Sequence, residues 1–119
     1  MTTTKAEGDA AEDRALGHLL AQGLVLLARN YRTPGRGGGE IDLVMRDRDG
    51  TLVFVEVRKR ASSRYGGAAG SVSALKQRRI VFAARHYLLR LAEPPPCRFD
   101  VISMEGRGIQ WMRAAFDAG

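Results

Sequence analysis

Two acidic residues, Asp42 and Glu56, stand among branched apolar residues in short segments that a charged turn separates. A carboxylate in apolar surroundings is costly unless it is paired or binds a metal ion. Carboxylate oxygens are hard ligands of the kind that Mg²⁺ and Mn²⁺ take. Such an ion could polarise a phosphoryl oxygen and lower the pKa of an attacking water. The pair therefore predicts a divalent-metal site that acts on phosphate.

A cationic side chain follows the second carboxylate at the spacing that this chemistry needs. Arg58 lies two positions beyond Glu56 and so shares its strand face, because strand side chains alternate. From there it could stabilise charge that develops on a phosphate. Lys59 points to the opposite face and is left out of the predicted site.

Two antiparallel strands are expected to position the pair, because the stretch from Gly39 to Arg60 alternates with a period of two. Asp47-Arg48-Asp49-Gly50 predicts the hairpin turn between them. In the second strand, one face is expected to hold Thr51, Val53, Val55 and Val57, and the other Leu52, Phe54, Glu56 and Arg58. In the first strand, Ile41, Leu43 and Met45 are expected to oppose Glu40, Asp42 and Val44.

The other predicted elements complete one α/β domain over residues 1–119. A frayed segment (1–8) precedes a helix to about Gln22, then come a strand over 24–30 and a glycine-rich loop over 33–39. A second helix is expected from Ser73 to about Leu91, with strands over 97–104 and 109–112. Its expected core face consists of Leu75, Ile80, Phe82, Ala83, Tyr87 and Leu91. The order α-β-β-β-α-β-β predicts a sandwich around one mixed sheet.

Several residues outside the strand pair have both a functional and a structural interpretation. Glu12, at the start of the first helix's apolar stripe, could reach the pair, form a capping box with Asp9 or interact with the helix dipole. Lys76 and Gln77 could point at the site from the second helix or lie on a solvated face. The glycine-rich loops could approach a phosphate or serve as plain connections.

The charge distribution favours a polyanionic partner. The formal net charge is +6, and residues 58–98, with 10 basic and 1 acidic residue, account for +9. A basic block beside a carboxylate cluster suits nucleic acid, although a solvated arginine-rich face is the alternative. No apolar run could span a bilayer and no apolar signal core opens the chain. The single cysteine, Cys97, agrees with a reducing cytosol, so we expect a cytoplasmic protein with no membrane contact.

Four motifs extend the pattern beyond the strand pair. They are Gly39-Glu40-Ile41-Asp42-Leu43-Val44, Phe54-Val55-Glu56-Val57-Arg58, Lys76-Gln77-Arg78-Arg79 and Arg98-Phe99-Asp100-Val101. In this order they resemble the YraN family of small bacterial proteins, over about residues 12–116. That family is expected to share the restriction-endonuclease-like fold, the PD-(D/E)xK superfamily, and is similar to archaeal Holliday-junction resolvases.

The resemblance implies roles for individual residues. Asp42 and Glu56 match the metal-binding carboxylates, with the carbonyl of Val57 as a further ligand. Glu12 resembles a first-helix glutamate that completes the resolvase site, and Gln77 a polar residue that faces the site in some relatives. The expected nucleic-acid contacts are Arg60, Arg64, Tyr65, Lys76 and Arg79, although surface decoration is as good an account of Arg64 and Tyr65.

The sequence departs from the superfamily pattern where a lysine is usual. Arg58 occupies that position, and arginine cannot give up its proton at useful pH. A lysine-as-base mechanism is therefore lost, whereas a metal-bound water as nucleophile is retained. Three hypotheses stay open: a Mg²⁺- or Mn²⁺-dependent nuclease acting on DNA, a non-catalytic nucleic-acid-binding module, and a protein-interaction or structural role. Action on symmetric branched DNA would require a homodimer.

Overall fold

The computed structural model describes residues 4–59 and 72–119 and forms one mixed sheet with a helix on each face. In these ranges the chain runs through α1 (Thr4–Ala21), β1 (Val25–Arg32), β2 (Glu40–Arg46), β3 (Leu52–Lys59), α2 (Ala74–Leu88), β4 (Cys97–Glu105) and β5 (Gly108–Phe116). The predicted order of elements is confirmed. No helix in these ranges has the length and apolar character of a membrane span.

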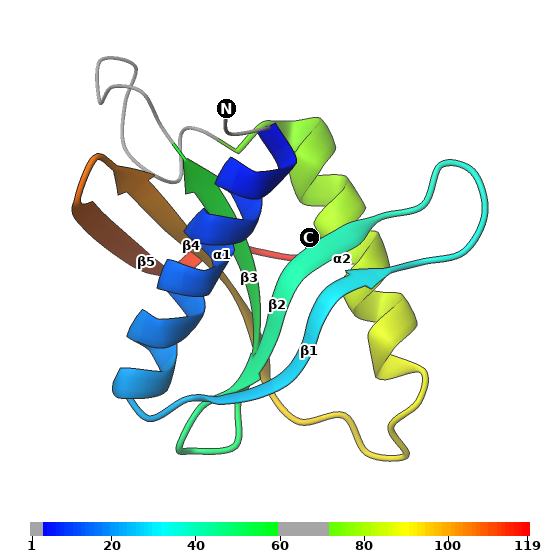
Figure 1. Cartoon of the computed structure of the whole chain (residues 1–119). Coiled ribbons are helices and arrows are strands. Elements are labelled where there is room, and N and C mark those ends of the chain that lie inside the picture. Colours follow the sequence, from blue (N-terminus) through cyan, green and yellow to red (C-terminus); the bar gives the residue numbers. More distant parts are fainter. Residues whose placement is uncertain (1–3, 60–71) are drawn as a thin grey trace.

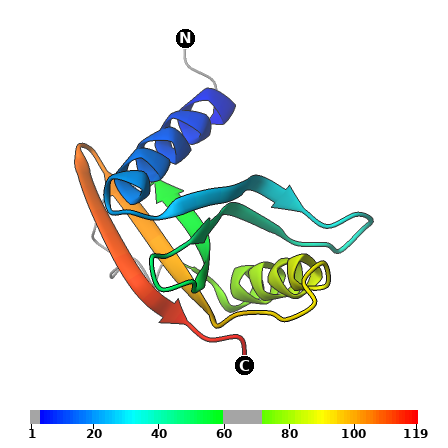
Figure 2. The ribbon, with the colours of Figure 1, turned by 90° about the horizontal axis from the view of Figure 1, so that it is seen from below.

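The strands lie in the order in which the chain makes them, β1-β2-β3-β4-β5 (Figure 1). Neighbouring strands are antiparallel except β3 and β4, which run parallel. Parallel neighbours need a crossover, and α2 lies between them in sequence. The crossover places α2 on the face of the sheet opposite to α1, as Figure 2 shows.

Each helix closes a separate apolar cluster. Ala15 and Leu19 of α1 pack with Val53 and Val55, and Ile80 and the other buried residues of α2 pack on the opposite face with Leu52 and Phe54. The alternation predicted for β3 is therefore confirmed. With apolar residues needed on both faces, the strand is buried almost throughout, and a carboxylate on it must be buried too.

Three local signals lie at element boundaries where the sequence predicted them. The Asp47–Gly50 turn closes with the Gly50 N–H donating to the Asp47 carbonyl at 3.0 Å, and Gly50 has a φ of 90°. Ser73 caps α2, since its side-chain oxygen accepts from the Lys76 N–H. Gly23 follows α1 with a φ of 95°, as a C-terminal stop requires.

Other expectations are corrected. The first helix begins at Thr4, which is earlier than a frayed segment over residues 1–8 allows, and the second ends at Leu88 rather than near Leu91. Leu75 and Phe82 are 51% and 54% exposed, so they do not belong to the core face of α2. The apolar surface of that helix extends beyond the part that packs on the sheet.

The expected face of Ile41 is also wrong. Leu43 and Met45 pack on the α1 side, but Ile41 belongs to the α2 cluster. The pairing of β2 with β3 ends at Leu43, whereas the pairing of β2 with β1 continues to Glu40. Beyond Leu43 this end of β2 lies against α2, where Gly39 meets the Arg79 backbone. Alternation along one strand does not reveal where the strand leaves its neighbour.

Candidate functional site

The candidate site lies where β2 and β3 separate. Their main-chain pairing runs from Arg46–Leu52 to Leu43–Val55 and stops there. The next residues in each strand are Asp42 and Glu56, which the same register would place opposite each other. The Asp42 Oδ2 accepts the Val57 N–H at 2.7 Å, so a carboxylate occupies the place of a main-chain carbonyl. This bond fixes the Asp42 carboxylate at the end of the ladder.

Glu56 is a buried carboxyl with an acidic neighbour. Only 4% of its surface is exposed. Burial, followed by a hydrogen bond with Asp42 and the negative charge of Asp42, raises the pKa of Glu56 from 4.5 to about 8. The cationic groups of Lys76 and Arg58 act in the opposite direction without cancelling the effect. The Glu56 carboxyl therefore keeps its proton to a higher pH than a solvent-exposed glutamate does.

Two cationic side chains approach this pair. The Arg58 guanidinium lies 3.9 Å from the Glu56 Oε2, as the shared strand face predicted. The Lys76 ammonium, from the first turn of α2, lies 3.6 Å from the same oxygen and 3.9 Å from Glu40 Oε1. The sequence associated Lys76 with nucleic-acid contacts and did not connect it to a particular carboxylate. The Ser73 cap was an available signal, because it puts Lys76 in the first helical turn.

Glu12 interacts electrostatically with Asp42. Burial and the Asp42 charge raise the pKa of Glu12, while the Arg29 guanidinium, 3.3 Å away, opposes that rise. Because α1 begins at Thr4, Glu12 lies well inside the helix and the capping box with Asp9 is wrong. The interpretation that places Glu12 near the strand pair is the one that agrees with these contacts.

The remaining predicted site residues are distributed differently. The Gln77 side chain donates to the Val72 carbonyl at 3.0 Å and so holds the start of α2. Arg79 lies one turn beyond Lys76 and lines a pocket with it. Arg60, Arg64 and Tyr65 lie outside the described residues. The structure thus brings Asp42, Glu56, Val57, Arg58, Lys76 and Glu12 to one region.

The fourth motif performs a structural task. The fully buried Asp100 accepts from Trp111 Nε1 at 3.0 Å, from the Ala114 N–H at 2.9 Å and from Arg98 Nε at 3.1 Å. Arg98 also pairs with Asp47 of the β2–β3 turn at 2.8 Å. These contacts join β4, β5 and the turn, and they satisfy a charge that would otherwise be buried without a partner.

The donors at the strand ends fit a hard divalent cation. Asp42 and Glu56 provide two carboxylates, and a cation between them would remove the repulsion that raises the Glu56 pKa. The Val57 carbonyl leaves β3 on the same edge as the N–H that Asp42 accepts, because a residue exchanges both its main-chain bonds with one neighbour. Across residues 4–59 and 72–119, no group of three His, Cys, Asp or Glu has the arrangement of a metal site. Water and substrate oxygens would complete the coordination.

Together, fold and site define a small α/β protein with a buried glutamate and a partly buried aspartate at the end of an interrupted strand pairing. The chain belongs to the uncharacterised protein family UPF0102, whose model matches residues 11–104. It is 74% identical over 118 residues to a UPF0102 protein of Paracidovorax citrulli, and the aligned residues make up 99% of this chain and 87% of that relative. It is 70% identical over 116 residues to a UPF0102 protein of Acidovorax sp., and the aligned residues make up 98% of this chain and 88% of that relative. UPF0102 is the YraN family, so the resemblance found in the sequence is confirmed. All four motifs lie within the matched residues.

Proposed function

We propose that the protein is a metal-dependent nuclease that hydrolyses phosphodiester bonds in DNA. The observation that supports this best is the meeting of Asp42 and Glu56 at the end of the β2–β3 ladder, beside two cations. In this proposal the carboxylates and the Val57 carbonyl hold Mg²⁺ or Mn²⁺. When bound, the ion lowers the pKa of an attacking water and polarises the phosphate. The mixed sheet would then be a small form of the restriction-endonuclease-like fold.

Lys76 supplies an ammonium group beside Glu56, although Arg58 stands in β3 where the superfamily usually has a lysine. An ammonium on a flexible stem reaches the buried carboxyl as closely as the guanidinium does, at 3.6 Å against 3.9 Å. We assign Arg58 to charge stabilisation on the phosphate, because a guanidinium binds phosphate bidentately. Lys76 is assigned to positioning the Glu56 carboxyl, which its ammonium contacts. The nuclease proposal therefore does not depend on a lysine in β3.

The first prediction concerns cleavage. Wild-type protein incubated with labelled linear, flapped and four-way-junction DNA is expected to nick at least one substrate with Mg²⁺ or Mn²⁺ and none with chelator. Glu56→Gln should lower the rate by about 100-fold or more, because it removes a metal ligand and leaves the side-chain shape. Glu105→Gln, a change at an exposed carboxylate at the end of β4, is the matched control and should leave the rate unchanged.

A second candidate function is favoured by Arg58. A guanidinium at the position of the usual lysine would retain phosphate binding while efficient cleavage is lost. A non-catalytic nucleic-acid-binding protein would bind every substrate with the same salt sensitivity and cleave none. Cleavage that appears only on Arg58→Lys would support this alternative. Chelator-sensitive cleavage by the wild type, lost in Glu56→Gln, would eliminate it.

A further inference from the structure

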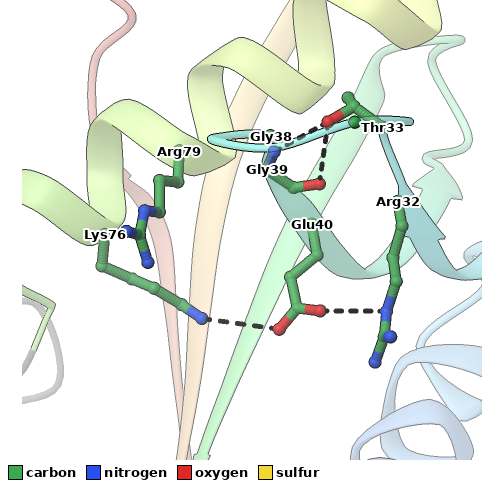
Figure 3. A pocket seen from close by; sticks show the side chains of 8 residues that line it. Arg32, Thr33, Gly38, Gly39, Glu40, Lys76 and Arg79 are labelled. Carbon is green, nitrogen blue, oxygen red and sulfur yellow. Dashed lines mark hydrogen bonds and ion pairs between the residues drawn. The ribbon is translucent and has the colours of Figure 1, made fainter.

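A second concave site adjoins the acidic pair. The end of β1, the β1–β2 loop and α2 line an open pocket of about 280 Å³ (Figure 3). Its charged lining consists of Arg32, Glu40, Lys76 and Arg79. Among the described residues, three cationic groups and one carboxylate give a net charge of +2 around a space large enough for a phosphate group. None of the metal chemistry assigned to Asp42 and Glu56 requires this pocket.

The cations are held at the pocket in two different ways. Glu40 lies between Arg32, whose Nε is 3.1 Å from Oε2, and Lys76, whose ammonium is 3.9 Å from Oε1. Arg79 stands beside Lys76 on α2, and in the part of the chain that the structure describes its side chain has no hydrogen bond or ion pair. An anion entering the pocket would therefore find one guanidinium without a competing carboxylate.

The walls of the pocket are closely fitted. The Thr33 N–H donates to the Gly39 carbonyl at 3.0 Å, and the Gly39 N–H donates to Thr33 Oγ1 at 2.8 Å, so the loop closes on itself. A Cβ on Gly39 would come within 1.9 Å of the Arg79 carbonyl oxygen, so only glycine allows the loop to lie this close to α2. The contact sets the loop and the Arg79 backbone at a fixed separation.

We propose that this pocket binds the terminal phosphate of a nucleic-acid strand whose backbone lies at the acidic pair. The inference rests on the proposed function, because it supplies the strand that connects the two sites. Lys76 links them physically, since its ammonium contacts Glu56 on one side and Glu40 on the other. A phosphate monoester carries a charge near −2 at neutral pH, which matches the pocket, whereas an internal phosphodiester carries −1.

The test compares strand ends without requiring cleavage. Oligonucleotides with a 5′-phosphate, a 3′-phosphate or hydroxyl ends, labelled at the other end, are titrated with protein in chelator and followed by fluorescence anisotropy. Wild type should bind one phosphorylated end about tenfold more tightly than the hydroxyl end. Arg79→Ala should abolish that preference. Arg78→Ala, one residue away on a different face of α2 and lining another pocket, should retain it.

Glu40→Gln provides a change in the opposite direction. It removes the only carboxylate that the described residues contribute to the pocket and ends the ion pairs of Arg32 and Lys76 with Glu40, so the preference for the phosphorylated end should increase. Equal affinity of wild type for phosphate and hydroxyl ends would overturn the inference. The same holds if Arg79→Ala weakens both oligonucleotides equally, because Arg79 would then contact an internal phosphodiester.

The outcomes separate this inference from the proposed nuclease. Metal-dependent cleavage without any preference for a phosphorylated end would contradict the pocket assignment and leave the nuclease intact. End preference without cleavage of any DNA would support the pocket and contradict the nuclease.

Discussion

At the residue scale, the protonation of Glu56 is set by its surroundings. Burial and the adjacent Asp42 raise the pKa of this carboxyl from 4.5 to about 8. Between these two values the unfolded chain releases the proton and the folded chain keeps it. The free energy of unfolding therefore falls as pH rises through this window. The stabilisation that comes from the protonated Glu56 is fully present only below about pH 4.5. A bound divalent cation would reverse the penalty, because its ligands must be deprotonated.

The second prediction follows from this linkage. Glu56→Gln should unfold at higher urea concentration than wild type at pH 8, with a gain on the order of 2–4 kcal/mol, and the gain should shrink toward pH 4.5. The measurement is urea unfolding of both proteins from pH 4.5 to 8 in chelator. Titrating groups that do not contact Glu56 cancel in the difference. Added Mg²⁺ should stabilise wild type at pH 8 and have little effect on Glu56→Gln. Parallel stability curves for the two proteins would contradict the assigned pKa.

At the element scale, the β1–β2 loop and α2 depend on each other. Gly39 is buried, and its main chain lies against the Arg79 carbonyl. The end of β2 that follows supplies Glu40 and Asp42, while α2 supplies Lys76. Any shift between loop and helix would change how these side chains meet. Packing between two elements far apart in sequence thus shapes the pocket and brings Lys76 to the acidic pair.

The third prediction tests that packing. Gly39→Ala should destabilise the protein by about 1–3 kcal/mol, because the added methyl group would overlap main chain that cannot move aside cheaply. Gly17→Ala is the control: it lies in α1 with open space around it and should stabilise by about 0.5–1 kcal/mol through helix propensity. Thermal unfolding of the two variants gives the comparison. Equal stability of Gly39→Ala and wild type would mean that the loop does not lie on α2 as described.

At the scale of the whole molecule, charge separates the remaining hypotheses. The net charge of +6 comes from residues 58–98, which carry +9 and include α2. A protein that neutralises phosphates with these groups releases counterions, so its affinity must fall with salt. A protein-interaction role in which the acidic pair only meets Arg58 and Lys76 carries no such requirement for nucleic acid.

The fourth prediction is the salt dependence of DNA binding. With about four phosphate contacts, affinity should fall by roughly 100-fold between 50 and 200 mM salt. Anisotropy titrations in chelator at several salt concentrations measure the slope. Asp42→Ala is the comparison, since a carboxylate contributes no counterion release and the slope should not change. The absence of salt-sensitive binding to any nucleic acid would favour the protein-interaction role.

The sequence by itself determined features that depend on neighbouring residues. The alternation of β3, the Asp47–Gly50 turn, the Ser73 cap and the acidic pair were all predictable, because strand period, turn conformation and capping act over a few residues. The family, too, followed from short motifs in order. These are the parts of the fold in which local chemistry leaves few alternatives.

Only the tertiary structure decided where these elements meet. Packing between strands and helices decides three features: the end of the β2–β3 pairing at Leu43, the place of Ile41 in the α2 cluster and the exposure of Phe82. The contact of Lys76 with Glu56 and the pocket beside it join segments that no periodicity relates. Such contacts result from packing between distant elements, because the positions of side chains in space follow from the whole fold and not from their own segment.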